Sequence, residues 1–154
     1  ISAANKAQLP CFKTMMSAFE TTWSHDGLVM DKWFAQIGVS PSVNCLAVVK
    51  ATLEHGSFSL ANPNRTRSLI GSFSALNTKA FHAIDGSGYV FLTDILCKLN
   101  SSNPQVASRL ITPLIEFKKF DLARQALMKE QLIRLSEIDA LATDLFEKID
   151  RALA

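Results

Sequence analysis

Three times in this sequence, a residue with a short polar side chain stands directly before proline. The pairs are Ser40-Pro41, Asn62-Pro63 and Asn103-Pro104. The polar side chain can accept a hydrogen bond from the free N–H groups of a first helical turn, and proline suits that turn because its missing N–H would have had no partner. Since a β-strand tolerates proline poorly, each pair predicts the start of a helix.

Apolar residues recur at helical spacing through the rest of the chain, and no segment alternates apolar and polar residues as a strand would. In the last segment Leu141, Leu145, Ile149 and Leu153 form one such stripe. We expect Pro113 to bend its helix, and Gly56 to close one in the left-handed conformation. The predicted helices are Pro10–Trp23, Leu28–Ile37, Pro41–Glu54, Pro63–Ala75, one from about Asp85 to Leu99, Pro104–Lys119, one capped by Asp121 and ending near Ser136, and a last one capped by Asp139.

The fold class is therefore all-α, in a single domain over residues 1–154. Asn62-Pro63 followed by Leu69-Ile70 is echoed by Asn103-Pro104 followed by Leu110-Ile111, at an offset of 41 residues. HEAT and armadillo solenoids repeat at about 40–47 residues, so we expect antiparallel helix pairs in a HEAT/armadillo-like α-solenoid. Antiparallel packing without a repeat remains the alternative.

The composition excludes several classes of partner. The chain has 154 residues, with 16 basic and 14 acidic side chains and a net charge of +2, which is too balanced for a nucleic-acid partner or an anionic membrane. The longest apolar run, Cys45 to Val49, is too short to span a bilayer. No secretion signal opens the chain, and the cysteines Cys11, Cys45 and Cys97 are separate and odd in number. These features predict a cytoplasmic protein with buried thiols.

No complete catalytic constellation is present. The histidines His25, His55 and His82 lack metal-ligand spacing, and no Gly-x-Ser-x-Gly elbow suggests a nucleophile. Gly86-Ser87-Gly88 lacks the lysine of a phosphate loop, so we interpret it as the start of a helix, with anion binding as the less favoured alternative. A small helical enzyme is therefore disfavoured.

One polar stripe allows two interpretations. Gln105, Arg109, Thr112 and Glu116 recur at helical spacing, opposite an apolar stripe. Spacing alone favours a solvated helix face. The alternative is one wall of a groove, in which arginine can hold a carboxylate through two hydrogen bonds. Two further arginines, Arg65 and Arg67, lie in the first turns of an earlier helix, and we expect the tryptophans and phenylalanines to lie in the core.

Four stretches of the chain are distinctive in combination. They are Gly27-Leu28-Val29-Met30-Asp31-Lys32-Trp33-Phe34, Asn62-Pro63-Asn64-Arg65-Thr66-Arg67-Ser68-Leu69-Ile70-Gly71, Phe81-His82-Ala83-Ile84-Asp85-Gly86-Ser87-Gly88-Tyr89, and Asn103-Pro104-Gln105-Val106-Ala107-Ser108-Arg109-Leu110. In that order and at those spacings, they resemble the C-terminal domain of bacterial aminopeptidase N, in the zinc-dependent gluzincin family. The resemblance covers nearly the whole chain and is least close around Ile1 to Phe19.

The resemblance implies a part of a larger zinc metallo-aminopeptidase, which removes single N-terminal residues from peptides. The family's His-Glu-x-x-His zinc motif and its Gly-x-Met-Glu-Asn segment belong to an earlier domain, and this chain has neither. The chain alone should therefore bind no zinc and be inactive. In the family, this domain is a bowl of helices that closes over the catalytic domain, its expected partner, around a chamber for peptide substrates.

The resemblance also implies roles for three residues of this chain. Gln105 matches a residue near the pocket for the first side chain of the substrate, and Arg109 and Arg67 match arginines of the chamber wall. Asp31, Asp85 and Tyr89 match positions that we expect to be structural. The main alternative is a free-standing helical-repeat module for protein interactions. A domain severed from a larger protein should instead expose the apolar patch that met its neighbour.

Overall fold

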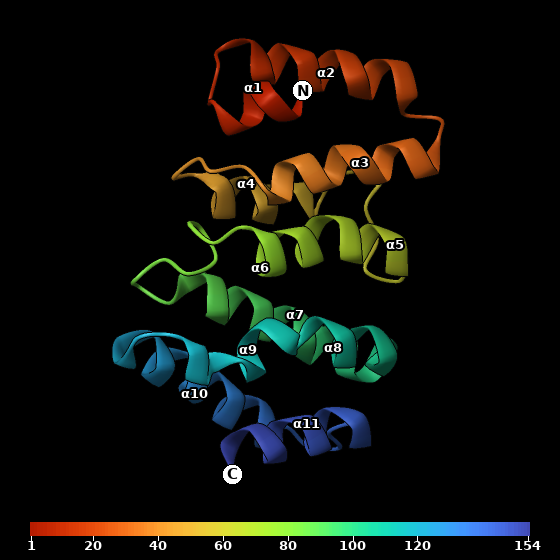
Figure 1. The fold of residues 1–154 in the computed structure, drawn as a ribbon. Coiled ribbons are helices and arrows are strands. Elements are labelled where there is room, and N and C mark those ends of the chain that lie inside the picture. The colour runs from red at the N-terminus through yellow and green to blue at the C-terminus, as the bar shows by residue number, and fades with distance from the viewer. The chain divides into compact units, whose positions relative to one another are not determined.

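The computed structural model describes residues 1–154 as helices joined by short loops, with no strand (Figure 1). It divides into two compact units, residues 1–80 and 81–154, each described by itself here. The first contains α1 (Ser2–Lys6), α2 (Cys11–Trp23), α3 (Gly27–Gly38), α4 (Cys45–Thr52), α5 (Pro63–Thr66), the π-helical turn Arg67–Gly71 and α6 (Ser72–Leu76). The second contains α7 (Ser87–Ser102), α8 (Pro104–Leu110), α9 (Thr112–Ile115), the 3₁₀ turn Phe117–Lys119, α10 (Leu122–Ser136) and α11 (Thr143–Leu153). The all-α prediction is confirmed.

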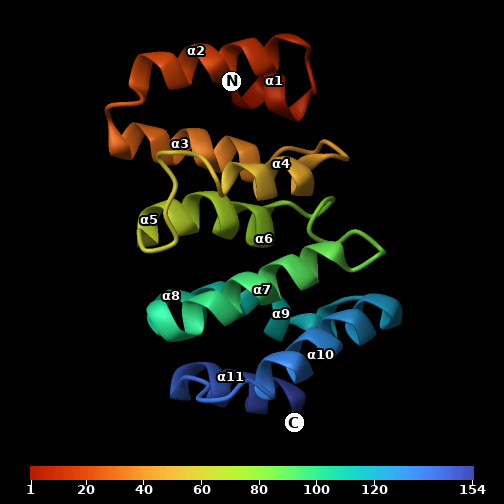
Figure 2. The same ribbon diagram turned by 180° about the vertical axis from the view of Figure 1, so that it is seen from behind.

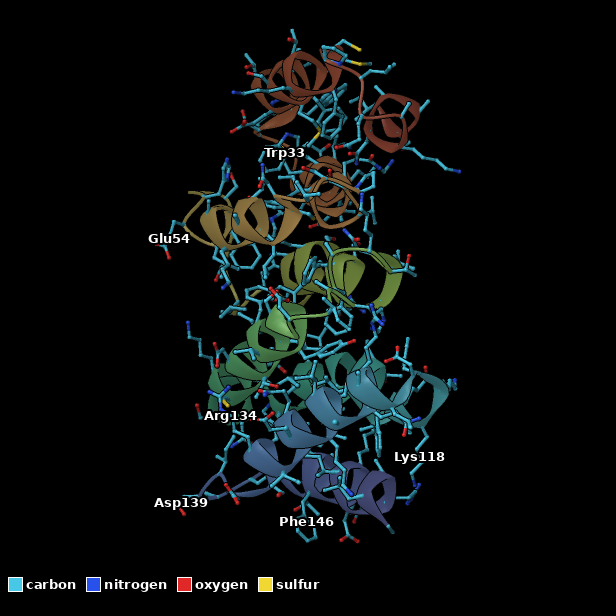
Figure 3. The ribbon with its side chains drawn as sticks, turned by 90° about the vertical axis from the view of Figure 1, so that its left-hand side faces the viewer. Trp33, Glu54, Lys118, Arg134, Asp139 and Phe146 are labelled. Atoms are coloured by element: carbon cyan, nitrogen blue, oxygen red, sulfur yellow. The ribbon has the colours of Figure 1, made fainter.

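In the first unit, α2 and α3 form an antiparallel pair, and α3 also lies beside the helix that runs from α5 to α6 (Figures 1 and 2). The Trp33 side chain faces α2 (Figure 3), and its Nε1 donates to the Met16 carbonyl at 3.0 Å. On the other side of α3, Gly38 packs directly on the backbone of the π-helical turn. A Cβ at this position would lie 2.6 Å from the Leu69 carbonyl oxygen, so this contact requires glycine.

In the second unit, α7 pairs antiparallel with α8, and α10 pairs antiparallel with α11 (Figures 1 and 2). The pairs stack in register, because α7 contacts α10 and α8 contacts α11. The core between them is apolar, with Leu92, Leu132, Leu145 and Ile149 essentially inaccessible to solvent. This arrangement of paired helices confirms the predicted packing for this unit.

Local capping signals explain where four of the helices begin. The side chains of Asp26, Asn62, Asn103 and Asp121 each accept hydrogen bonds from backbone N–H groups of the following helix. Pro113 was expected to bend one continuous helix, but the helix is interrupted there: α8 ends at Leu110 and α9 follows. Proline cannot donate to the carbonyl four residues earlier, and the Thr112 hydroxyl donates to that carbonyl, of Arg109, at 3.0 Å.

Two predicted helix starts are wrong, and tertiary contacts explain both of them. The Ser40-Pro41 pair does not start a helix, because Asn77 Nδ2 donates to the carbonyl of Ser40 at 2.8 Å and α4 begins only at Cys45. Asp139 does not cap the last helix, which begins at Thr143. Instead Asn100 of α7 accepts from the Ala142 N–H at 2.8 Å and donates to the Ala140 carbonyl at 3.2 Å.

Glycine, cysteine and tryptophan positions supply the remaining corrections. Gly56 does not adopt the left-handed conformation; among the glycines only Gly86, just before α7, has a positive φ, of 72°. Of the thiols expected to be buried, Cys45 is buried, Cys97 is partly exposed and Cys11 is exposed. Trp23 was expected in the core but is 41% exposed. No helix has the length and apolar character needed to cross a membrane.

Candidate functional site

Two of the three residues predicted as substrate contacts lie together in one groove. Gln105 and Arg109 occupy successive turns of α8 and line an open polar groove of about 470 Å³ between α8 and α11. Both side chains are exposed, while Val106 and Leu110 on the opposite side of α8 are buried. The first two residues of the polar stripe therefore form a wall of a groove, while Thr112 and Glu116 are exposed outside it.

The opposite wall comes from α11, and the sequence pattern did not identify its residues as part of a site. Asp144, Glu147, Lys148 and Arg151 line the groove, at spacings of three, one and three residues that place them on one side of the helix. In the sequence these charges are indistinguishable from the solvated face of an amphipathic helix. Only the contact between α8 and α11 turns them toward Gln105 and Arg109.

One hydrogen bond joins the two walls. Lys148 of α11 donates from Nζ to the carbonyl oxygen of Ser108, which lies in α8 between the two predicted residues. Ser108 is buried and Lys148 is only partly exposed. The bond fixes the lysine ammonium at the base of the groove, and the ammonium group has two further N–H donors.

Arg67, the third predicted residue, lies in the first unit, at the start of the π-helical turn. Its side chain is exposed, and its Nη2 donates to Asn64 Oδ1 at 2.5 Å. π-Helical turns within α-helices are frequent at functional sites.

Arg65, two residues earlier, has a structural role. It is 8% exposed and forms an ion pair with Asp31 of α3, which agrees with the structural role expected for that aspartate. Its Nε donates to the Ser57 carbonyl at 3.0 Å, its Nη1 donates to the Gly27 carbonyl at 2.6 Å, and its guanidinium lies 5.3 Å from the Phe34 ring centroid.

The histidines take part in packing contacts. His55 Nε2 is 2.8 Å from Glu20 Oε1, and its Nδ1 accepts from the Ser57 N–H at 3.1 Å. His82 stacks on Phe120 at a centroid distance of 4.3 Å, and its Nδ1 is 2.8 Å from the Tyr89 hydroxyl. Burial, with a smaller contribution from the Arg124 guanidinium, lowers the pKa of His82 below 6.5.

No three His, Cys, Asp or Glu side chains of the structure come close enough together to hold a metal ion. In the glycine-rich segment at the start of α7, the Ser87 N–H already donates a hydrogen bond to the Asp85 carboxylate, at 3.0 Å. This bond disfavours the anion-binding interpretation of Gly86-Ser87-Gly88.

Comparisons with known proteins show where this chain belongs. Residues 1–154 match the family model described as "Domain of unknown function (DUF3458_C) ARM repeats". The chain is 56% identical to aminopeptidase N of Haemophilus influenzae over 153 residues and 53% identical to aminopeptidase N of Escherichia coli over 154 residues. These alignments cover 99% and 100% of this chain, in the C-terminal domain of the relatives, and 18% of each relative's length.

A solved structure shows the same fold. The crystal structure of Legionella pneumophila aminopeptidase A in complex with aspartic acid matches with a TM-score of 0.85 and 29% identity, over 92% of this chain and 16% of that one. Together with the armadillo-type family model, this match confirms the solenoid class predicted from the sequence.

Proposed function

This chain belongs to the ARM-repeat family described as DUF3458_C, and from this premise we propose that it forms part of the peptide chamber of an aminopeptidase. In this role it supplies no catalytic group. It encloses the peptide, excludes water and folded proteins, and contributes to the choice of substrate.

The groove between α8 and α11 carries this proposal. Gln105 and Arg109 approach it from adjacent turns of α8. A glutamine side chain can donate to and accept from a peptide backbone, and arginine can bind a carbonyl or carboxylate with two N–H groups. Arg67, the third residue, presents an exposed guanidinium held by Asn64. We propose all three as chamber-wall residues, with Gln105 near the first side chain of the peptide and Arg109 and Arg67 along the peptide beyond it.

The surface of α2 favours this role over a free-standing interaction module. Its apolar stripe includes Phe12, Met16, Phe19 and Trp23, yet only Met16 is buried within the unit. Met15 beside the stripe is 37% exposed. A solenoid that stands alone needs terminal repeats with a polar outer surface. The uncovered stripe on α2 instead suits a helix packed against a neighbouring part of a larger protein.

The catalytic partner would be another domain of the same parent chain. The zinc ion and the groups that activate water would belong to that domain, where the metal polarises the scissile carbonyl. A cytoplasmic location agrees with three cysteines that form no disulfide.

The test uses the full-length parent protein and the variant Arg109→Ala. We expect kcat/KM for an alanine tetrapeptide to fall about 5- to 100-fold, the range for one lost charge-assisted contact of roughly 1–3 kcal/mol. The value for alanyl p-nitroanilide, which has no peptide beyond its first residue, should change less than 2-fold. Lys129→Ala is the matched control, because Lys129 is an exposed cation on α10 outside the groove. Equal losses on the two substrates would refute the proposed role.

A further inference from the structure

The groove between α8 and α11 is lined by five charged side chains that form no ion pairs. Arg109 lines the groove from α8, and Asp144, Glu147, Lys148 and Arg151 line it from α11. None of these five side chains takes part in any of the ion pairs of the structure. Asp144 and Lys148, and likewise Glu147 and Arg151, have the four-residue spacing that favours a pair along one helix, but neither pair forms.

The three cations are held at different points of the groove. Lys148 is fixed by its bond to the Ser108 carbonyl, Arg109 projects from α8, and Arg151 projects from the last turn of α11. With three cations against two carboxylates, the groove keeps one positive charge in excess. A carboxylate group can accept hydrogen bonds from several such donors at once, and guanidinium groups bind it with two parallel bonds.

We propose that this groove is a carboxylate-binding site, in which Arg151 and Lys148 of α11 act with Arg109 to hold an anionic group of the peptide substrate. The proposal rests on the chamber role proposed above and adds the second wall of the groove to it. The carboxylate is either the free C-terminus of the peptide or an acidic side chain, since both present the same two oxygens.

The acidic residues of the groove limit its preference for carboxylates. Glu147 lies one turn from Arg151 on the same side of α11, so it repels an incoming carboxylate. A neutral or amidated peptide does not meet this repulsion and gains nothing from the cations. Removal of Arg151 and removal of the Glu147 charge should therefore change the preference for carboxylates in opposite directions.

The experiment uses the full-length parent protein and three peptide substrates. They are an alanine tetrapeptide with a free C-terminus, the same peptide as its amide, and an amidated tetrapeptide with aspartate at the third position. The wild type should show a KM several-fold lower for the free acid than for the amide. Arg151→Ala should raise KM for the free acid about 5- to 10-fold, with kcat and the KM of the amide nearly unchanged. Arg151→Lys should restore part of the difference, and Glu147→Gln should enlarge it.

The aspartate peptide identifies the source of the carboxylate. If Arg151→Ala raises the KM of the aspartate peptide as well as that of the free acid, the groove accepts both carboxylates. A response of the aspartate peptide alone assigns the site to acidic side chains, and a response of the free acid alone assigns it to the C-terminus. A wild type that binds neither the free acid nor the aspartate peptide better than the plain amide, or an Arg151→Ala variant that leaves both preferences unchanged, would overturn the proposal. Arg109→Ala, assayed on the tetrapeptide and on alanyl p-nitroanilide, separates this failure from that of the chamber role: a selective loss on the peptide would leave that role intact.

Discussion

The contact between Gly38 and the π-helical turn Arg67–Gly71 predicts a specific cost for one added methyl group. In Gly38→Ala, the new Cβ would lie 2.6 Å from the Leu69 carbonyl oxygen and 2.9 Å from the Phe73 amide nitrogen. Both atoms belong to backbone, so no side-chain rotation can relieve the contact. To reach an ordinary distance of 3.4 Å, α3 and the neighbouring helix must separate by about 0.8 Å at this point.

The expected loss of stability follows from two opposing effects. An extra methyl group in a well-packed contact costs about 1–3 kcal/mol. Alanine is the better helix former by up to about 1 kcal/mol, but Gly38 is the last residue of α3 and gains only part of this. The free energy of unfolding should fall by about 1–2 kcal/mol, which lowers Tm by roughly 2–8 °C in a chain of this size.

Gly56→Ala is the matched control, because the added Cβ would meet no atom within 4 Å and Gly56 has no positive φ. This substitution should leave stability unchanged or raise it by up to about 1 kcal/mol, because alanine restricts the unfolded chain. Thermal unfolding of both variants, followed by circular dichroism at one pH, makes the comparison. Equal melting temperatures for the two variants would refute the packing argument.

Three further predictions concern other parts of the chain. The fold lowers the pKa of His82. The neutral imidazole therefore stabilises the fold fully above pH 6.5, and this stabilisation is lost as the pH falls from 6.5 through the folded pKa. The variant His82→Gln should show a smaller pH dependence of the free energy of unfolding, measured with urea from about pH 5 to 8. Burial raises the pKa of Cys45 to about 11, so iodoacetamide at pH 8 should modify the exposed Cys11 well before Cys45, as mass spectrometry of the native protein can measure. Arg65→Met should destabilise the chain by about 3–5 kcal/mol, because it leaves the Asp31 carboxylate without its partner; a loss below 1 kcal/mol in chemical denaturation would contradict the assigned structural role.

The sequence predicted those features of the fold that depend on neighbouring residues. The caps at Asn62, Asn103 and Asp121 act on N–H groups two or three residues away, so the local pattern contains the whole interaction. The sequence-based prediction failed where contacts between residues far apart in the chain determine the local structure. Asn77 holds the segment after α3 out of helix, and Asn100 holds the segment before α11. Neither contact leaves a sign in the local sequence.

The candidate site shows the same division. The helical spacing of Gln105 and Arg109 placed both on one side of α8, and the family resemblance turned that polar stripe into a candidate site. The charges of α11 follow the ordinary pattern of a solvated helix face, and only the stacking of α11 on α8 brings Arg151 and Glu147 into the groove. The α11 residues of the groove can therefore be identified only once the packing of the two helices is known.

The most direct test of the chamber role is the structure of the full-length parent protein with a non-hydrolysable peptide analogue bound. The account predicts the peptide within hydrogen-bond distance of Gln105 or Arg109, with the groove between α8 and α11 open to the chamber. If both side chains instead faced bulk solvent on the outside of the molecule, away from the peptide, the proposed function of this domain would be contradicted.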